Sequence, residues 1–292
     1  METPEIHKEL EALVNLIDEP DETIYRQIRD RILTYKKTAV PYLEKAWENN
    51  LQPLAQHRIE VLIHKLQFEN LLEELNNWYS LGGTNLLMGY ILVSKYQYPN
   101  LDEQKVKKNL ERIKQDIWLE LNPHLTAFEK AGVVNRILYT ENKFETDRSE
   151  FNTPLSYFIN NVIDTHTGNH LSLALVQLIL SGLAELPVYG VNLPGNFILA
   201  YMDEHTRIHG LPLSEAEVLF YINPASKGAF FTRHEIDLFL KQRKIEPQYS
   251  FYRPCSNIII IKRMLQELHE VYKSSGNDIR SDEVETLLRI FC

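Results

Sequence analysis

The polar residues best suited to chemistry gather just before the longest apolar stretch of the chain. The run HTGNHLS, residues 166–172, opens a segment from Leu171 to Leu183 that predicts a buried core helix. At a helix N-terminus the macrodipole and the free N–H groups favour negative charge, so a thiol placed there ionises easily. The position is therefore typical of a nucleophile.

The segment GVNLPGNFILAY, residues 190–201, predicts a hairpin that delivers one polar residue to a buried strand. Pro194 and Gly195 favour the two central positions of a type II turn. The expected strands span Val188–Val191, Phe197–Met202 and Val218–Ile222. A base on the second strand and a carboxylate on the third would complete a nucleophilic triad. The residue that the turn delivers is Asn196, whose amide does not titrate near neutral pH.

The order and spacing of these motifs resemble the transglutaminase-like superfamily, and more narrowly its bacterial SirB-type branch. That branch carries Gly-x-Pro-[Ile/Leu]-Ser-Leu, then Gly-Val-x-x-Pro-x-His-Phe, then [Phe/Tyr]-Ile-Asp-Pro. The corresponding stretches here are GNHLSL (168–173), GVNLPGNF (190–197) and YINP (221–224). Residues 135–169 also resemble the helix and loop that precede the first motif. The resemblance implies a papain-type core with Cys on a helix and with His and Asp on successive strands.

The residues at the implied triad positions differ from those of the family. The nucleophile position falls on His170 or Ser172, the base position on Asn196 and the acid position on Asn223. An amide cannot take the proton of a nucleophile, and an unassisted serine hydroxyl is a very weak nucleophile. We therefore expect a pseudoenzyme that acts as a binding or scaffolding module for a protein, a peptide or a small polar ligand.

An alternative keeps the chemistry with a rearranged nucleophile. An amide hydrolase or acyl transferase could use Ser172 or Cys255 in that role. A dyad of Ser172 with His170 requires His170 to precede the helix, because residues two apart on a helix point to different sides. Asn196 could also donate to an oxyanion, although this needs a nucleophile that the sequence does not identify.

A metal site is the third interpretation. Two histidine pairs at four-residue spacing each follow an aspartate by two residues: Asp164, His166 and His170, then Asp203, His205 and His209. These groups would bind a metal if they met in space. Solvated loop histidines explain the same pattern, and no cofactor is expected.

Three tyrosines, Tyr189, Tyr201 and Tyr221, fall on the expected strands. They could line a cleft with an amphipathic wall. Ordinary sheet packing is the favoured explanation, because tyrosine prefers strands.

The composition limits the remaining function classes. The chain has 292 residues, 44% of them apolar, and a net charge of −9. An acidic chain without a basic run is a poor candidate for nucleic-acid binding. Its two cysteines exclude a disulfide framework within the chain and a four-thiolate zinc site, and fit a reducing compartment. The polar N-terminus and the shortness of the apolar segments predict a cytoplasmic protein without a membrane segment.

The helices and strands expected along the chain indicate an α+β fold dominated by helices. Residues 1–80 are expected to form helices of HEAT type, because the stretch from Asp18 to Trp47 resembles one HEAT repeat. Residues 81–254 are expected to form the SirB-type transglutaminase-like core with a small antiparallel sheet. Residues 255–292 are expected to form a C-terminal helical hairpin.

Overall fold

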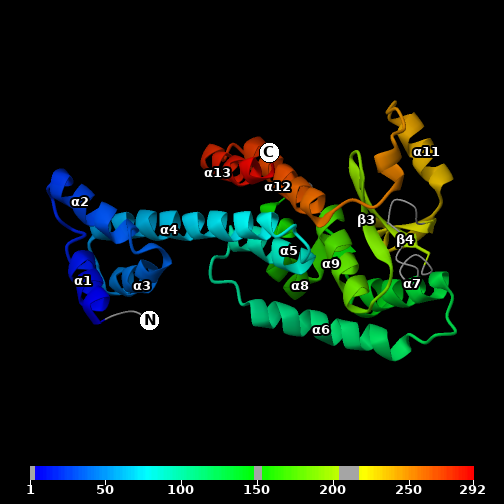
Figure 1. The fold of residues 1–292 in the computed structure, drawn as a ribbon, viewed down its shortest axis with the longest axis horizontal. Coiled ribbons are helices and arrows are strands. Elements are labelled where there is room, and N and C mark those ends of the chain that lie inside the picture. The colour runs from blue at the N-terminus through cyan, green and yellow to red at the C-terminus, as the bar shows by residue number, and fades with distance from the viewer. Residues whose placement is uncertain (1–3, 148–152, 204–216) are drawn as a thin grey trace. The chain divides into compact units, whose positions relative to one another are not determined.

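A computed structural model describes residues 4–147, 153–203 and 217–292. The chain divides into two compact units, Met1–Asn77 and Trp78–Cys292. Most described residues are helical, and the sheets are small, as the ribbon in Figure 1 shows. This confirms the expected α+β class, while the three-part domain division stays a prediction.

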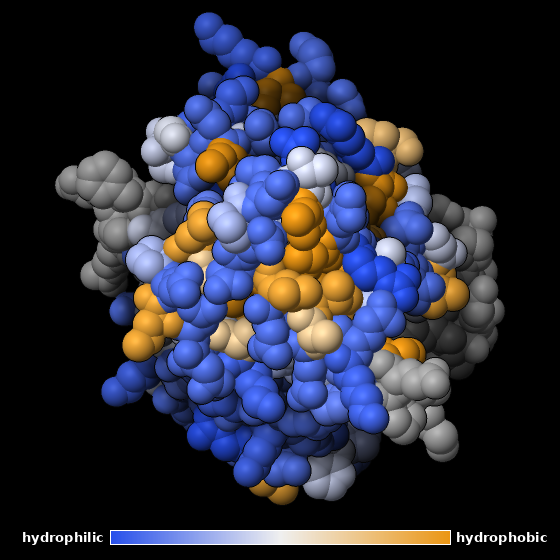
Figure 2. All heavy atoms as spheres, turned by 90° about the vertical axis from the view of Figure 1, so that its left-hand side faces the viewer, coloured by the Kyte–Doolittle hydropathy of each residue, from blue (hydrophilic) through white to orange (hydrophobic). Residues whose placement is uncertain are grey.

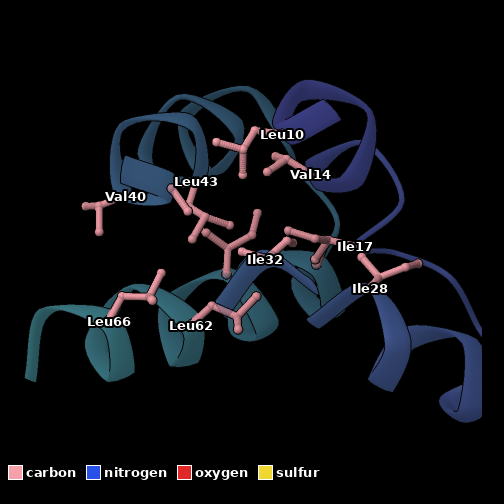
Figure 3. Packing of buried hydrophobic residues seen from close by; sticks show 12 residues of the cluster. Leu10, Val14, Ile17, Ile28, Ile32, Val40, Leu43, Leu62 and Leu66 are labelled. Atoms are coloured by element: carbon pink, nitrogen blue, oxygen red, sulfur yellow. The ribbon is translucent and has the colours of Figure 1, made fainter. Parts of the chain in front are cut away.

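The first unit consists of helices around one apolar core. Its elements are α1 (Pro4–Val14), α2 (Glu22–Leu33), the short 3-10 helix η1 (Lys36–Ala39), α3 (Val40–Asn49) and the first part of α4 (Pro53–Ser80). The carboxylate of Asp21 starts α2 by accepting hydrogen bonds from the next backbone N–H groups. Apolar residues of all four α-helices interlock in the core (Figure 3), where Leu10, Ile32 and Leu43 are completely buried.

A buried arginine connects the chain after α1 to α4. Arg58 donates hydrogen bonds to the carbonyl oxygens of Ile17, at 2.9 Å, and Glu19, at 2.7 Å, and pairs with Glu22. Its guanidinium carbon lies 3.7 Å from the centre of the Tyr25 ring. A buried charge is tolerated when it is paired and hydrogen-bonded in this way.

The first unit also exposes apolar side chains. They are Leu16, Ile24, Trp47, Leu51, Leu54 and Val61. Figure 2, a view from the left-hand side of Figure 1, shows apolar patches framed by hydrophilic residues. Exposed apolar patches of this kind are typical of binding surfaces.

The second unit carries the remaining helices. Those before the sheet are α5 (Leu86–Lys95), α6 (Glu103–Glu120), α7 (Ala127–Asn135), the π-helix η2 (Arg136–Glu141), η3 (Pro154–Tyr157), α8 (Ile159–Thr165) and α9 (His170–Leu183). Those after its first strands are η4 (Pro224–Ser226), α11 (Arg233–Gln242), η5 (Tyr249–Tyr252), α12 (Asn257–Ser274), α13 (Asp278–Leu288) and η6 (Arg289–Phe291). No helix within the described ranges is long and apolar enough to cross a bilayer.

The main sheet is an antiparallel meander. It contains β3 (Val188–Leu193), β4 (Asn196–Met202), β5 (Val218–Asn223) and β6 (Ala229–Phe231) in that order. The three strands expected from the sequence are confirmed, whereas β6 was not predicted. Leu193 pairs with Asn196 across the two-residue turn, and Gly195 has the positive φ, 70°, that the third position of a type II turn requires. A second, two-stranded parallel sheet joins β1 (Glu145–Thr146) to β2 (Thr167–Gly168).

The two faces of the main sheet pack on different helices. Ile198 and Ala200 of β4 form one apolar cluster with Ile236 and Leu240 of α11. On the other face a side chain at Gly190 would meet Phe197 of β4 and Ile260 of α12, at 2.6 and 3.0 Å. This alternation decides which helix each strand residue can reach.

A buried polar network fixes α9 to the turn between β5 and β6. Tyr139 donates to Gln177, Gln177 donates to Asn135, and Asn135 donates to the carbonyl oxygen of Gly228, each at 2.7 Å. Every member thus has a partner, which is the condition for a buried polar network to stabilise a fold.

Candidate functional site

The helix α9 begins at His170, one residue before the predicted start at Leu171, and Asn169 caps it. The Asn169 side chain accepts hydrogen bonds from the backbone N–H groups of Leu171 and Ser172, at 2.9 and 2.8 Å. The cap places His170 in the first helical turn, where its side chain remains 31% exposed. Two of the free N–H groups that could favour an anion are therefore already used.

Ser172 lies in the interior of the protein. It has no exposed surface, and its hydroxyl donates to the carbonyl oxygen of Asn169 at 3.2 Å. A side chain at Gly168 would come within 2.4 Å of the Ser172 hydroxyl, so this environment is tightly packed. Ser172 and His170 share no hydrogen bond, as expected for two residues on the same helix. A substrate cannot reach the Ser172 hydroxyl without rearrangement of the packing around it.

An open pocket of about 620 Å³ lies beside the first turn of α9. Its polar lining includes Tyr157, His170, Asn192, Gln266, Glu267 and Glu270. Pro194 and Gly195, which form the β3–β4 turn, complete one wall. The volume is within the range of small-ligand pockets, and the lining mixes apolar surface with a few polar groups. We call this cavity the α9 pocket.

A charged cluster stands at the wall of the α9 pocket. Glu267 of α12 accepts a hydrogen bond from Arg263 Nε at 2.9 Å and lies 3.4 Å from His170 Nε2, which has no hydrogen-bond partner. Tyr157 donates to the other Glu267 oxygen at 3.4 Å. Burial alone raises the pKa of Glu267, but His170 and Arg263 outweigh it and hold the pKa below the ordinary carboxyl value. Glu267 is therefore ionised at neutral pH.

Arg263 joins this cluster to the β3–β4 hairpin. Its Nη1 atom donates to Asn192 Oδ1 at 2.5 Å and to the carbonyl oxygens of Leu193 and Asn196 at 2.9 and 2.8 Å. The side chain is only 11% exposed. One guanidinium thus satisfies three acceptors of the turn and one carboxylate of its own helix, a geometry that lysine cannot reproduce.

The two asparagines at the implied base and acid positions make local contacts. Asn196 Oδ1 accepts a hydrogen bond from the backbone N–H of Phe197 at 2.9 Å. Asn223 donates to Ser226 at 3.2 Å, and its buried Oδ1 has no partner. By strand alternation both share the sheet face that packs on α11, whereas His170 meets α12. Within the described part of the chain, no hydrogen bond or ion pair joins any two of the four implied triad positions.

The three tyrosines of the strands are packing residues. Tyr201 is completely buried and stacks on Phe220, with ring centres 5.1 Å apart. Tyr221 stacks on Phe231 and donates to the carbonyl oxygen of Tyr252 at 2.9 Å. Tyr189 packs against the cluster beneath α11. The tyrosine that lines the α9 pocket is instead Tyr157.

The histidines do not assemble a metal site among the residues described. His166 stacks on Phe144, with ring centres 4.6 Å apart, while His170 faces Glu267. Asp164 pairs with Lys105 at 2.7 Å. His205 and His209 lie outside the described residues. No group of three or more His, Cys, Asp or Glu side chains that could hold a metal ion occurs in the described ranges.

Cys255 is unsuited to act as a displaced nucleophile. Burial raises the pKa of its thiol to about 11, although the nearby Arg263 charge opposes this shift. The thiolate is the reactive form, so at neutral pH Cys255 is present almost entirely as the inert thiol.

This state of Cys255 gives a direct prediction for alkylation by iodoacetamide. The rate at Cys255 should rise about tenfold per pH unit between about pH 8 and pH 10, because the thiolate fraction rises tenfold per unit below the pKa. Peptide mass spectrometry would follow both cysteines, with the exposed Cys292 as internal reference. Reaction of Cys255 ahead of Cys292 at neutral pH would contradict the assignment.

The lowered pKa of Glu267 predicts a pH-dependent contribution to stability. The contribution should be complete above the ordinary carboxyl pKa of about 4.5 and should be lost as the pH falls through the lower folded-state pKa. The difference in unfolding free energy between the native protein and Glu267→Gln should therefore be largest near neutral pH and should shrink below about pH 4. Urea unfolding between pH 3 and pH 7 measures it, with Glu246→Gln, at an exposed position, as control. A difference that does not vary with pH would exclude this ionic role.

The sequence did not identify Glu267, Arg263 and Tyr157 as residues of the pocket. The two charges stand four apart in the apolar run of α12, and that spacing puts them on one face of the helix. The pattern contains no information on which partner that face meets. Only the fold brings α12 against the start of α9.

The region around the α9 pocket matches a known family model. The model of the transglutaminase-like superfamily matches residues 104–266, which is more than half of the chain. The chain therefore belongs to the transglutaminase-like superfamily. The match includes α9, the strands and Arg263, and it ends one residue before Glu267.

The chain is also similar to curated bacterial proteins. It is 23% identical over 197 residues to a UPF0162 protein of Xylella fastidiosa strain 9a5c, covering 65% of this chain and 66% of that protein. It is 26% identical over 175 residues to a UPF0162 protein of Pseudomonas aeruginosa, covering 59% of each. The chain thus spans just under two thirds, or less, of the length of these relatives.

A eukaryotic relative shares a shorter segment. F-box only protein 21 of Mus musculus is 24% identical over 156 residues, covering 53% of this chain and 23% of that protein. No solved structure gives a significant match.

Proposed function

We propose that this chain is a non-catalytic member of the superfamily that binds a protein segment, a peptide or a small polar ligand in the α9 pocket. The observation that carries the proposal is the complete burial of Ser172, the only hydroxyl among the two implied nucleophile positions, His170 and Ser172. A group that attacks a substrate must reach it, and this hydroxyl is instead bonded to the backbone. The α9 pocket is an open surface at the start of α9 that a ligand can reach.

The proton-transfer groups give independent support. Asn196 and Asn223 carry amides, which neither accept a proton from a nucleophile nor stabilise an imidazolium by charge. The alternative with a rearranged nucleophile would need Cys255, and its raised pKa opposes that role. The loss of the base and the loss of its partner acid are consistent with each other. This is expected when a site has lost its chemistry while the fold is retained.

The lining of the α9 pocket suits recognition. The His170 ring is 31% exposed with its Nε2 atom turned toward Glu267, and the Gln266 amide can both donate and accept. The Arg263 charge is neutralised by Glu267, so the exposed carboxylate of Glu270 leaves the pocket slightly acidic. Such a lining favours polar, neutral or basic peptide segments over anionic ones.

The proposal also includes the family branch, the type of the first unit, the class of partner and the cellular location. The order of the motifs supports a SirB-type member, and the acidic opening of α2 followed by the Pro41 start of α3 supports a HEAT-like first unit. A protein partner fits the exposed apolar residues of that unit. The acidic composition supports a cytoplasmic role without nucleic-acid or membrane binding.

Peptide selection on the purified full chain tests the proposal. Peptides selected by display should bind with affinities that fall at least about tenfold in His170→Ala, because the partly exposed His170 ring forms part of the pocket wall. His234→Ala is the matched control, since His234 is exposed on α11 away from the pocket. Fluorescence anisotropy measures both. Equal affinities in the native chain and in His170→Ala would reject the α9 pocket as the binding site.

A further inference from the structure

A second pocket lies between α6 and α8, and no part of the proposed function uses it. Its volume is about 420 Å³. Its polar lining comes from the loop before α6, the first turns of α6 and the helix α8. They include Tyr98, Asp102, Lys105, Asn109, Asn160 and Asp164. We call it the α6 pocket.

The α6 pocket contains hydrogen-bonding groups that the described protein leaves unused. Asn160 Oδ1 is buried without a partner, and its amide nitrogen makes only a long contact of 3.4 Å to Asn161. The half-buried Asn109 side chain has no hydrogen bond to any residue in the described ranges. Unsatisfied, partly buried amides are costly unless water or a ligand completes their bonds. The buried Asn160 oxygen and the half-buried Asn109 amide, which come from different helices, therefore indicate a site for a molecule that both donates and accepts.

The charges of the α6 pocket argue against an ionic ligand. Lys105 is paired with Asp164 at 2.7 Å, which links α6 to α8. Asp102 uses one oxygen to cap α6 by accepting from the Lys105 backbone N–H at 3.0 Å. The cap also means that the helix N-terminus is not free for an anion. An anion would meet the Asp102 carboxylate, and a cation would find that carboxylate partly used by the cap and Asp164 already paired with Lys105, so neither class is favoured.

The α6 pocket also has an apolar part. Leu101, Val106 and Ile163 contribute aliphatic surface between the polar groups. Hydroxyl groups donate and accept at once, as the amides do, and the carbon skeleton of a polyol matches the aliphatic patch. We propose that the α6 pocket binds a neutral polyhydroxylated molecule of the size of a mono- or disaccharide.

Saturation-transfer NMR on the full chain tests the α6 pocket. The probes are maltose, trehalose and myo-inositol, with inorganic phosphate, spermidine and adenosine as the other ligand classes. For at least one of the three polyols the saturation-transfer signal should reach a plateau at millimolar ligand concentration. The affinity of that polyol should fall at least about tenfold in Asn109→Ala. Gln115→Ala is the matched control, because Gln115 is an exposed amide on the same helix that does not line the pocket.

Three outcomes would overturn the α6 pocket proposal. The first is that the signal of no polyol reaches a plateau by about 50 mM. The second is that only phosphate, spermidine or adenosine binds. The third is that a polyol binds Asn109→Ala and the native chain with equal affinity. Because Asn109 makes no bond within the described protein, its replacement should leave the urea unfolding midpoint unchanged. That measurement separates loss of binding from loss of fold.

Discussion

Replacement of Arg263 by Met is expected to lower the free energy of unfolding by about 3 kcal/mol, because a nearly buried network loses the cation that donates four of its hydrogen bonds. The change leaves three acceptors of the β3–β4 hairpin without their donor. It also removes one of the two groups that offset the burial of the Glu267 carboxylate. Urea unfolding at neutral pH, followed by tryptophan fluorescence, measures the loss.

Two further substitutions make the Arg263 result specific. Arg263→Lys keeps the charge but cannot make the fork of hydrogen bonds, so it should fall between the native protein and Arg263→Met. Arg289→Met removes an exposed cation that pairs with Glu285 at 3.5 Å, and it should change stability by less than about 0.5 kcal/mol. Equal losses for Arg263→Met and Arg289→Met would show that the Arg263 network contributes nothing beyond a surface ion pair.

Replacement of Gly228 by Ala is expected to cost about 3 kcal/mol or more, from two separate causes. Gly228 has a φ of 75°, a conformation that residues with a Cβ adopt only with strain. A Cβ there would also lie 2.2 Å from the Asn135 side chain, which holds Gln177 in the buried network. The Asn135 side chain cannot move away without breaking its hydrogen bonds to Gly228 and Gln177. Urea unfolding of the variant measures the combined cost.

Two other glycines separate the causes. Gly276 has a φ of 73° but open space around it, so Gly276→Ala should cost only the conformational strain, about 1 kcal/mol. Gly182 lies in α9 with ordinary φ and open space, so Gly182→Ala should be neutral or stabilising by up to about 1 kcal/mol. A cost at Gly228 no greater than that at Gly276 would contradict the role given to the Asn135 contact.

The sequence predicted the elements around the site because their signals are local. The apolar run after Asn169 and the Pro194-Gly195 turn depend on neighbouring residues alone, and both were confirmed. The strand β6 was missed because three residues are too few for a period to be recognised. Its pairing with β5 depends on the turn at Gly228, whose left-handed conformation the sequence did not reveal.

The candidate site was less predictable because it depends on contacts distant in the chain. The amides at 196 and 223 could be recognised from the motifs, but not the sheet face to which they belong. His170 and Glu267 are 97 residues apart in the sequence and lie on two different helices. No local sequence pattern predicts that these helices pack together. The burial of Ser172 likewise depends on the packing of Gly168 against it.

The most direct test of the account is covalent labelling of the purified chain at pH 7.5 with a fluorophosphonate and, separately, with iodoacetamide. Ser172 is inaccessible and Cys255 is protonated, so neither should be modified selectively or stoichiometrically. Intact-mass and peptide mass spectrometry measure the extent and the position of labelling. Stoichiometric modification of Ser172 or Cys255 that disappears in His170→Ala would show a working nucleophile and would contradict a non-catalytic cleft.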